Sequence, residues 1–346
     1  MKKKIVCCIG LLLLTVLILN GMQMLTMPKY MTSSREGALI GEYYAETTDH
    51  DVLFVGDCEV YEAFTPPTLW EEYGITSYIR GSAQQLVWQS YYLLEEMLKR
   101  ETPQAVVFNV LSLEYGTPQN EAYNRMTLDG MRISGSKLRA VLASVTKEET
   151  PVSYLFPLLR FHSRWDELTE EDFTYLFHRD RVSHNGYLMQ TAVKAKTEDL
   201  PGEVLADYTL PSVSMEWLER MRVLCEEKGV TLILVKTPTN NWKYHWYDEW
   251  DQQITDYAAR QELPYYNFIP LSEEIGLDWA TDTYDGGVHL NVYGAEKLTS
   301  YFGAILSETF GLEDRRSEPA LSAVWSQKMT DYYQERNGTD AGKETE

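Results

Sequence analysis

The chain is poor in cysteine, histidine and basic residues for its length. Its 346 residues include four cysteines and six histidines, and 31 lysine and arginine residues stand against 52 acidic ones, for a formal net charge of −21. Cys7 and Cys8 lie within an apolar N-terminal segment, and the two cysteines that remain, Cys58 and Cys225, exclude a framework of several disulfides. The acidic balance argues against nucleic acid and against a polybasic membrane contact, because both require a cationic face.

Motifs for metals, phosphates and repeats are also missing. His178, His184 and His245 have neither the spacing nor the companions of a metal site. The chain has no glycine-rich phosphate loop and no internal repeat. We therefore expect no metal and no cofactor. An apolar content of 44% is enough for a sizeable core, and the length suits one large domain or one domain with an insertion.

One long apolar run is present at the N-terminus. Three lysines precede a charge-free run from Ile5 to about Leu25, and at ~1.5 Å per residue about 20 helical residues cross a ~30 Å hydrocarbon core. Because no good cleavage site follows, residues 1–27 favour an uncleaved signal anchor over a cleaved signal peptide. The lysines predict a cytoplasmic N-terminus and an extracytoplasmic body of a single-pass cell-membrane protein. Residues 28–47 are expected to link the anchor to the domain.

The body of the chain alternates strand-like and helix-like segments. The expected strands are 52–55, 77–79, 105–110, 231–235 and 265–268. The central ones are continuous apolar runs, as is typical of parallel strands covered on both faces. Helices are expected between them, including 86–98 and 217–228. The alternation predicts a doubly wound, mainly parallel α/β domain of three layers (α/β/α) over residues 48–312.

Two regions break this alternation. Residues 112–200 carry helical patches at 137–145 and 169–177 but no strong strand. They predict a helical insertion above the sheet, where such enzymes usually build a substrate cleft. After Leu312 the sequence is polar and charged, so residues 313–346 are expected to form a partly disordered tail.

Residues capable of catalysis follow the expected strands. Cys58 comes after the first strand, Gly81 after the second and Asn109 ends the third, while Asp285 and His289 lie in the loop before the last helix. In open α/β sheets, ligands bind beyond the carboxyl ends of the strands, so these five positions are expected to share one site. A nucleophile type after the first strand with a late Asp/His pair indicates a hydrolase triad, here with a thiol.

These blocks resemble the SGNH (GDSL-like) hydrolase superfamily, which combines a Gly-Asp-Ser sequence, a glycine, an asparagine and a late Asp-x-x-His. The stretch 289–297, His-Leu-Asn-Val-Tyr-Gly-Ala-Glu-Lys, is similar to the closing segment of membrane-anchored SGNH-like proteins of Gram-positive bacteria. Some of those work beside membrane-bound O-acyltransferases, as the D-alanylation protein of teichoic acid operons does. The resemblance covers about residues 48–312.

The chain departs from the family pattern in two places. Cys58 stands where the family has serine, and Asp285 precedes His289 by four residues rather than three. Asp285 can still reach the imidazole if the two glycines at 286 and 287 bend the loop, because glycine adopts unusual backbone angles. Asp282 is the alternative acid.

The resemblance implies a role for each residue. The Cys58 thiol would attack an acyl carbonyl, His289 would take its proton, and Asp285 would orient the imidazole. The backbone N–H groups of Cys58 and Gly81 and the side chain of Asn109 would hold the oxyanion. Two effects on the thiol pKa oppose each other: neighbouring Asp57 and Glu59 raise it, and a helix N-terminus lowers it. The sequence leaves the balance open.

Further residues are candidates for substrate binding. They are Asp57, Lys236 at the end of a strand on the same sheet edge, and the aromatic and cationic cluster of His162, Arg164 and Trp165 in the insertion, for which solvated helix packing is the alternative.

The expected function is acyl transfer, as esterase or O-acyltransferase, on a cell-envelope glycopolymer. The alternative is a non-catalytic envelope scaffold that binds polymer or a membrane-bound O-acyltransferase partner. A weaker third possibility is a redox-sensitive surface protein that uses Cys58.

Overall fold

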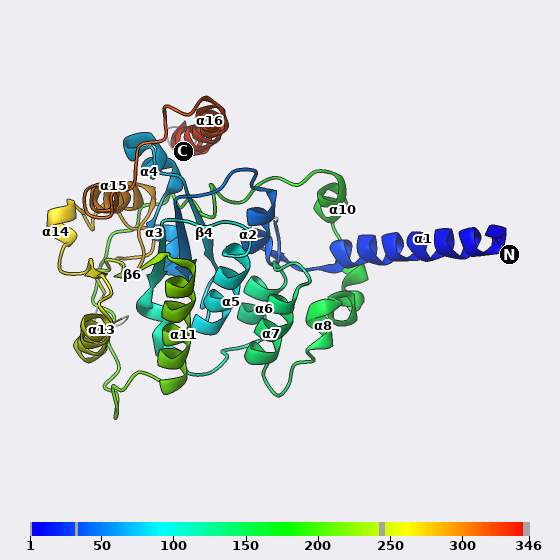
Figure 1. The fold of residues 1–346 in the computed structure, drawn as a ribbon, viewed down its shortest axis with the longest axis horizontal. Coiled ribbons are helices and arrows are strands. Elements are labelled where there is room, and N and C mark those ends of the chain that lie inside the picture. The colour runs from blue at the N-terminus through cyan, green and yellow to red at the C-terminus, as the bar shows by residue number, and fades with distance from the viewer. Residues whose placement is uncertain (1, 32–33, 242–245, 342–346) are drawn as a thin grey trace.

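Five buried segments form the central sheet of the protein, which we describe from a computed structural model covering residues 2–31, 34–241 and 246–341. Its strands are β3 (Val52–Gly56), β4 (Ser77–Gly81), β5 (Ala105–Asn109), β6 (Thr231–Lys236) and β7 (Tyr265–Asn267). They pair in parallel in the order β4-β3-β5-β6-β7 (Figure 1). Each strand overlaps a predicted one, and the predicted doubly wound parallel α/β fold is confirmed.

The strand order determines where the sheet opens. Counted along the chain, the order is 2-1-3-4-5, as in flavodoxin-like folds. The chain moves outward from β3 to β4 and then returns to the other side of β3 to form β5. The connections therefore diverge between β3 and β5, and we refer to the carboxyl ends of these two strands as the β3–β5 crevice, because open α/β sheets bind ligands at this position.

Successive strand residues face opposite helical layers because side chains alternate across a strand. Leu53 and Val55 of β3 pack toward α5 (Val87–Met97), α11 (Ser212–Lys228) and α13 (Asp248–Gln261). Val52 and Phe54 pack toward α3 (Cys58–Ala63), α4 (Pro66–Tyr73) and α15 (Val292–Glu308). All four of these β3 side chains are fully buried. The continuous apolar pattern of the strand thus reflects burial on both faces.

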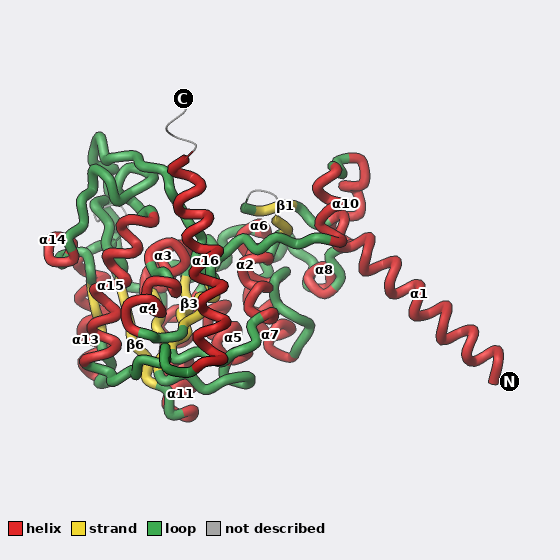
Figure 2. Tube along the Cα trace, turned by 90° about the horizontal axis from the view of Figure 1, so that it is seen from above, coloured by secondary structure: helices red, strands yellow, loops and turns green. Residues whose placement is uncertain are grey.

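Most of the helical insertion lies beside the sheet, whereas the sequence predicted an insertion above it. It contains α6 (Glu121–Leu128), α7 (Gly135–Ser144), α8 (Val152–Leu155), α9 (Leu158–Phe161), η3 (His162–Asp166) and α10 (Glu170–Phe177). Its inner side chains Leu128, Val141 and Tyr154 pack with Leu93 of α5 and with Ile40 of α2 (Ala38–Gly41). In Figure 2 these helices lie between the sheet and α1 (Lys2–Thr26).

Two parts of the insertion reach the carboxyl edge of the sheet. Thr127 of α6 lies 2.5 Å from Ser82, directly after β4, and the extended end of the insertion bonds to β4 and α3. The N–H of Ile79 in β4 donates to the carbonyl of Asn185 (2.9 Å), and the N–H of Leu188 donates to the carbonyl of Tyr61 in α3 (2.9 Å). Residues 183–200 therefore border the carboxyl edge, where the helices were expected.

The N-terminal helix α1 projects from the body (Figure 1). Among the described residues, it is the one helix long and apolar enough to cross a membrane, with 25 residues. This matches a signal anchor or a signal peptide. The following segment, which the sequence predicted to link the anchor to the domain, forms the hairpin β1 (Lys29–Tyr30)–β2 (Ser34–Arg35), α2 and η1 (Glu42–Ala45), with Ile40 and Tyr43 in the core.

The C-terminal segment is also ordered, contrary to expectation. Helix α16 (Pro319–Ala341) packs on α4, where Trp325 is fully buried and stacks on Trp70 with ring centroids 5.3 Å apart. Tyr332 of the same helix is buried as well. Large apolar side chains in a polar sequence therefore anchor this helix, together with ion pairs such as that of Arg336 with Glu296. Residues 342–346 of the expected tail lie outside the described residues.

Candidate active site

Cys58 occupies the first position of α3, directly after β3. Asp57 is the N-cap of this helix, and its Oδ1 accepts a hydrogen bond from the N–H of Glu59 (3.1 Å). Asp57 and Glu59 are buried, whereas Cys58 is partly exposed. The short turn from strand to helix therefore leaves the thiol at the carboxyl end of β3, at the crevice that the strand order creates.

Gly81 lies beside this turn, paired with Gly56 across the β3–β4 ladder. A Cβ atom at Gly81 would lie 3.1 Å from the carbonyl oxygens of both Gly56 and Asp57. These distances are tighter than ordinary contacts, so a side chain would displace the turn that carries Cys58. A glycine is therefore needed here for close backbone approach.

His289 and Asp285 form a directly bonded pair in the loop before α15. Asp285 Oδ2 lies 2.7 Å from His289 Nδ1. The other carboxylate oxygen, Oδ1, accepts the backbone N–H groups of His289 (2.9 Å) and Val288 (3.2 Å). The carboxylate is thus held by the loop that carries the imidazole, and it fixes the ring's orientation.

The loop reaches this arrangement through its two glycines. Gly286 and Gly287 have φ angles of 89° and 91°, in the region that disfavours other residues. The resulting bend brings Asp285 to the histidine despite the four-residue spacing. The alternative acid, Asp282, is instead paired with Lys297 (2.6 Å), on α15.

The thiol and the imidazole influence each other's protonation. Burial and the negative charge of Asp57 raise the pKa of Cys58 to about 11, although a hydrogen bond with His289 opposes the change. Burial disfavours the charged imidazole, but hydrogen bonds to Asp285 and Cys58 outweigh it and hold the pKa of His289 well above its usual value. At neutral pH the site therefore favours a neutral thiol beside a protonated imidazole.

Glu62 is a site residue that the sequence analysis missed. Its Oε2 lies 3.8 Å from His289 Nδ1 and accepts a hydrogen bond from the hydroxyl of Tyr284 (2.9 Å). Burial raises the pKa of Glu62 to about 7. Glu62 follows Cys58 by four residues, so in a helix both occupy one face. The four-residue spacing is the feature of the sequence that could have indicated Glu62. Its use requires knowing that α3 begins at Cys58.

Glu59 and Lys236 form a buried ion pair beneath the nucleophile. Lys236 Nζ lies 2.7 and 2.9 Å from the two carboxylate oxygens of Glu59, and both side chains are almost fully buried. Glu59 Oε2 also accepts the hydroxyl of Thr237 (2.6 Å) and the side-chain nitrogen of Asn109 (3.0 Å). The charge of Glu59 is thus balanced within this cluster.

Asn109 lies beside the Cys58 turn as expected, but its side chain is already engaged in hydrogen bonds within the protein. It lies at the end of β5 next to the Cys58 turn, since its Cβ is 3.1 Å from where a Cβ of Gly56 would stand. However, the side chain is fully buried, its oxygen accepts the N–H of Leu111 (2.8 Å), and its nitrogen donates to Glu59. The bond to Glu59 connects β5 to α3.

The aromatic and cationic cluster of the insertion is placed elsewhere. In η3, Arg164 donates to the carbonyl of Thr26 at the end of α1 (2.8 Å), and His162 contacts the carbonyl of Leu159 (3.2 Å). Trp165 is 71% exposed. These contacts link the cluster to α1 and to its own segment rather than to the Cys58 region, so the expectation that it lines the substrate cleft is not supported.

Space beside the pair is limited. A hollow lined by Glu59, Glu62, Thr237 and His289 adjoins the imidazole, and it is too narrow in this structure to hold a water molecule. Within the described residues, no group of three or more His, Cys, Asp or Glu side chains could hold a metal ion. His245 lies outside those residues.

Comparisons with known proteins give only distant similarity. No protein-family model and no curated protein matches the chain. Among solved structures, a GDSL-like lipase from Bacteroides thetaiotaomicron aligns with 13% identity and a TM-score of 0.37, over 80% of this chain and 98% of that one. A proposed acylhydrolase from Bacteroides fragilis aligns with 12% identity and a TM-score of 0.38, over 78% of this chain and 95% of that one.

Proposed function

We propose that this protein is an extracytoplasmic acyl-transfer enzyme that uses Cys58, His289 and Asp285 on acyl esters of a cell-envelope glycopolymer. The observation that carries the proposal is the bonded series of groups at the β3–β5 crevice. Asp285 lies 2.7 Å from His289, and the imidazole of His289 and the thiol of Cys58 are close enough to shift each other's pKa. An activated nucleophile requires a base in contact and a group that orients the base.

The reaction begins when neutral His289 takes the Cys58 thiol proton. The thiolate sulfur attacks the acyl carbonyl, and collapse of the tetrahedral species forms a thioester while the leaving alkoxide takes the proton from His289. A hydroxyl acceptor, or water, then gives its proton to His289 and attacks the thioester, which regenerates the thiol. Because the pKa of His289 is raised, its neutral form becomes more abundant as the pH rises.

Helix α1 supports the proposed location. A 25-residue apolar helix next to an initial run of lysines fits a signal anchor with a cytoplasmic N-terminus. The folded body would then face the cell envelope, where glycopolymers carry ester-linked acyl groups. A membrane-bound O-acyltransferase is the proposed partner, on the basis of the family resemblance.

The test is acylation of the full-length protein in lipid nanodiscs. The protein is exposed briefly to p-nitrophenyl acetate, and the adduct is mapped by peptide mass, with Cys58→Ala and His289→Ala variants in parallel. We expect an acetyl group on Cys58 that forms quickly only when His289 is present. Equal labelling of the His289→Ala variant would reduce Cys58 to an ordinary thiol and reject the proposal.

Two observations favour a second candidate, a non-catalytic scaffold that binds polymer or the acyltransferase. The pKa of Cys58 is raised to about 11, and the hollow at His289 is small. This candidate predicts that Cys58→Ala retains envelope acylation in cells, whereas the enzyme predicts its loss. The redox role has no further support, because Cys58 and Cys225 are both free and Cys225 is buried.

A further inference from the structure

Exposed apolar side chains gather on the insertion segments that surround the base of α1. On α8, α9, η3 and α10, and on the residue that ends α8, six large apolar side chains are 45–91% exposed: Val152, Phe156, Leu159, Trp165, Phe173 and Phe177. Helix α1 contacts α9, η3 and α10 directly, and Figures 1 and 2 show these segments around its base. The segments also contact one another, α8 with α9 and α9 with η3, and exposed apolar side chains that gather on adjacent segments usually mark an interaction site.

The end of α1 is bonded to these segments. Arg35 donates to the carbonyl of Met24 (2.7 Å), and Arg164 of η3 donates to the carbonyl of Thr26 (2.8 Å). These two cations satisfy carbonyl groups that the last turn of a helix leaves open, and they complement the helix dipole. The body therefore cannot turn freely about α1.

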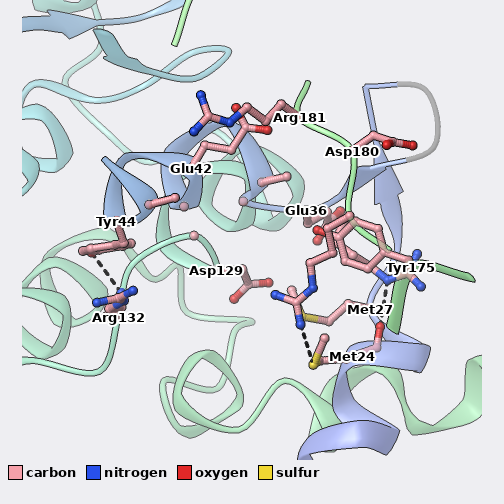
Figure 3. A pocket seen from close by; sticks show the side chains of 17 residues that line it. Met24, Met27, Glu36, Glu42, Tyr44, Asp129, Arg132, Tyr175, Asp180 and Arg181 are labelled. Carbon is pink, nitrogen blue, oxygen red and sulfur yellow. Dashed lines mark hydrogen bonds between the residues drawn. The ribbon is translucent and has the colours of Figure 1, made fainter. Parts of the chain in front are cut away.

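Two ion pairs also hold α10 beside the end of α1. Lys29, just after α1, is 2.6 Å from Glu171, and Arg35 is 2.8 Å from Asp172. A cavity of about 490 Å³ separates the end of α1 from α2 and α10, and Met24, Met27 and Tyr175 are among the residues that line it (Figure 3). The last turn of α1 is thus part of the folded body rather than a flexible exit.

Simple geometry places this junction at a membrane surface. The apolar run from Ile5 to Leu25 spans ~31 Å as a helix, at ~1.5 Å per residue, which matches a ~30 Å hydrocarbon core. The arginines at the end of α1 then lie at the level of the lipid headgroups, where Trp side chains also concentrate. Trp165 is the most exposed tryptophan of the described chain and lies in a segment that contacts α1.

We propose that α8, α9, η3 and α10 form a membrane-facing collar, whose exposed apolar side chains enter the interface of the outer lipid leaflet around α1. The ligand of this surface is the lipid bilayer. Side chains that would be unfavourable in water are covered by lipid, as in amphipathic helices that lie in a membrane interface. Together with the bonds to α1, the collar holds the domain in one orientation above the membrane. The proposal depends on α1 crossing the bilayer and not on the chemistry of Cys58.

Quenching by brominated lipids tests the collar in the full-length protein. Helix α1 contains no tryptophan, and Trp165 is one of nine in the chain. In nanodiscs made with lipids brominated on the upper acyl chain, we expect a loss of about one ninth of the emission relative to unbrominated nanodiscs. This loss should disappear in Trp165→Phe and persist in Trp279→Phe. Equal quenching in Trp165→Phe and the unaltered protein, or none in the latter, would overturn the proposal.

A gain of signal provides an independent test with a matched control. Phe177 and Val204 are 91% and 94% exposed, so a tryptophan at either position disturbs no packing. Phe177→Trp should increase the fraction of emission that the brominated lipid quenches, whereas Val204→Trp should add only unquenched emission. Equal behaviour of the two variants would also overturn the proposal. Co-purification with the nanodiscs reports separately whether α1 is inserted.

Discussion

Removing one member of the Glu59–Lys236 ion pair should destabilise the protein strongly. The two side chains are 3% and 0% exposed, and Lys236 Nζ lies within 2.9 Å of both carboxylate oxygens. Solvent therefore does not screen the pair or replace a missing partner. Breaking such a buried pair costs about 3–5 kcal/mol, because the remaining charge is left uncompensated. We expect this loss for Glu59→Gln and for Lys236→Met.

The double variant Glu59→Gln/Lys236→Met separates the effect of the charge from that of packing. It removes both charges of the pair, so neither member is left without its partner, and it should recover part of the stability that each single variant loses. The neighbours Thr237 and Asn109 can still bond to a glutamine at position 59. A control at the surface pair Arg222–Glu226, in which Glu226 is the exposed member, is Glu226→Gln, and it should change stability by less than about 1 kcal/mol.

The assay is thermal and denaturant-induced unfolding of the full-length protein in nanodiscs. For a domain of this size, 3–5 kcal/mol corresponds to a fall in Tm of roughly 6–10 °C. If each single variant lost less than about 1 kcal/mol, or if the losses simply added in the double variant, the pair would not be a buried, mutually compensating one. Our reading of the region beneath Cys58 would then be refuted.

Three further predictions concern the site and the C-terminal helix. The raised pKa values of Cys58 and His289 keep both groups protonated at neutral pH. The rate of Cys58 acylation should therefore increase up to tenfold per pH unit from about pH 6 to about pH 8. A rate of adduct formation that does not change with pH would contradict this. Asp285→Asn removes a group that raises the pKa of His289. The acylation rate should therefore depend less on pH and fall by up to about 10⁴-fold. An unchanged acylation rate in the same assay would exclude Asp285 as the orienting acid. Trp325→Ala empties the space against Trp70 and should cost about 3–5 kcal/mol in denaturant-induced unfolding; a loss below about 1 kcal/mol would mean that α16 is only loosely attached.

The central sheet was predictable because its signal is local. Each strand is a short apolar run whose side chains are buried on both faces, as Leu53 and Phe54 show on opposite sides of β3. The C-terminal helix was missed for the opposite reason. Its sequence is mostly polar, and a few residues such as Trp325 hold it through contacts with α4, which is more than 240 positions earlier.

The site was only partly accessible from sequence. Strand-end positions and a family resemblance indicated Cys58, Asp285 and His289, and the structure brings these three side chains to the same crevice. The roles of Glu62 and of the Glu59–Lys236 pair depend on contacts between separate elements. No spacing along the chain could show them without the start of α3 and the path of β6.

By itself, the sequence determined the local features of the protein: the apolar N-terminal run, the alternation of strands and helices, and the residue types at the strand ends. These follow from side-chain size, polarity and periodicity, which act over a few residues. Only the tertiary structure decided the protonation of the Cys58–His289 pair and the position of the insertion beside α1. Both depend on which distant groups come within a few ångströms, since burial and nearby charge set a pKa, and complementary surfaces set where helices pack.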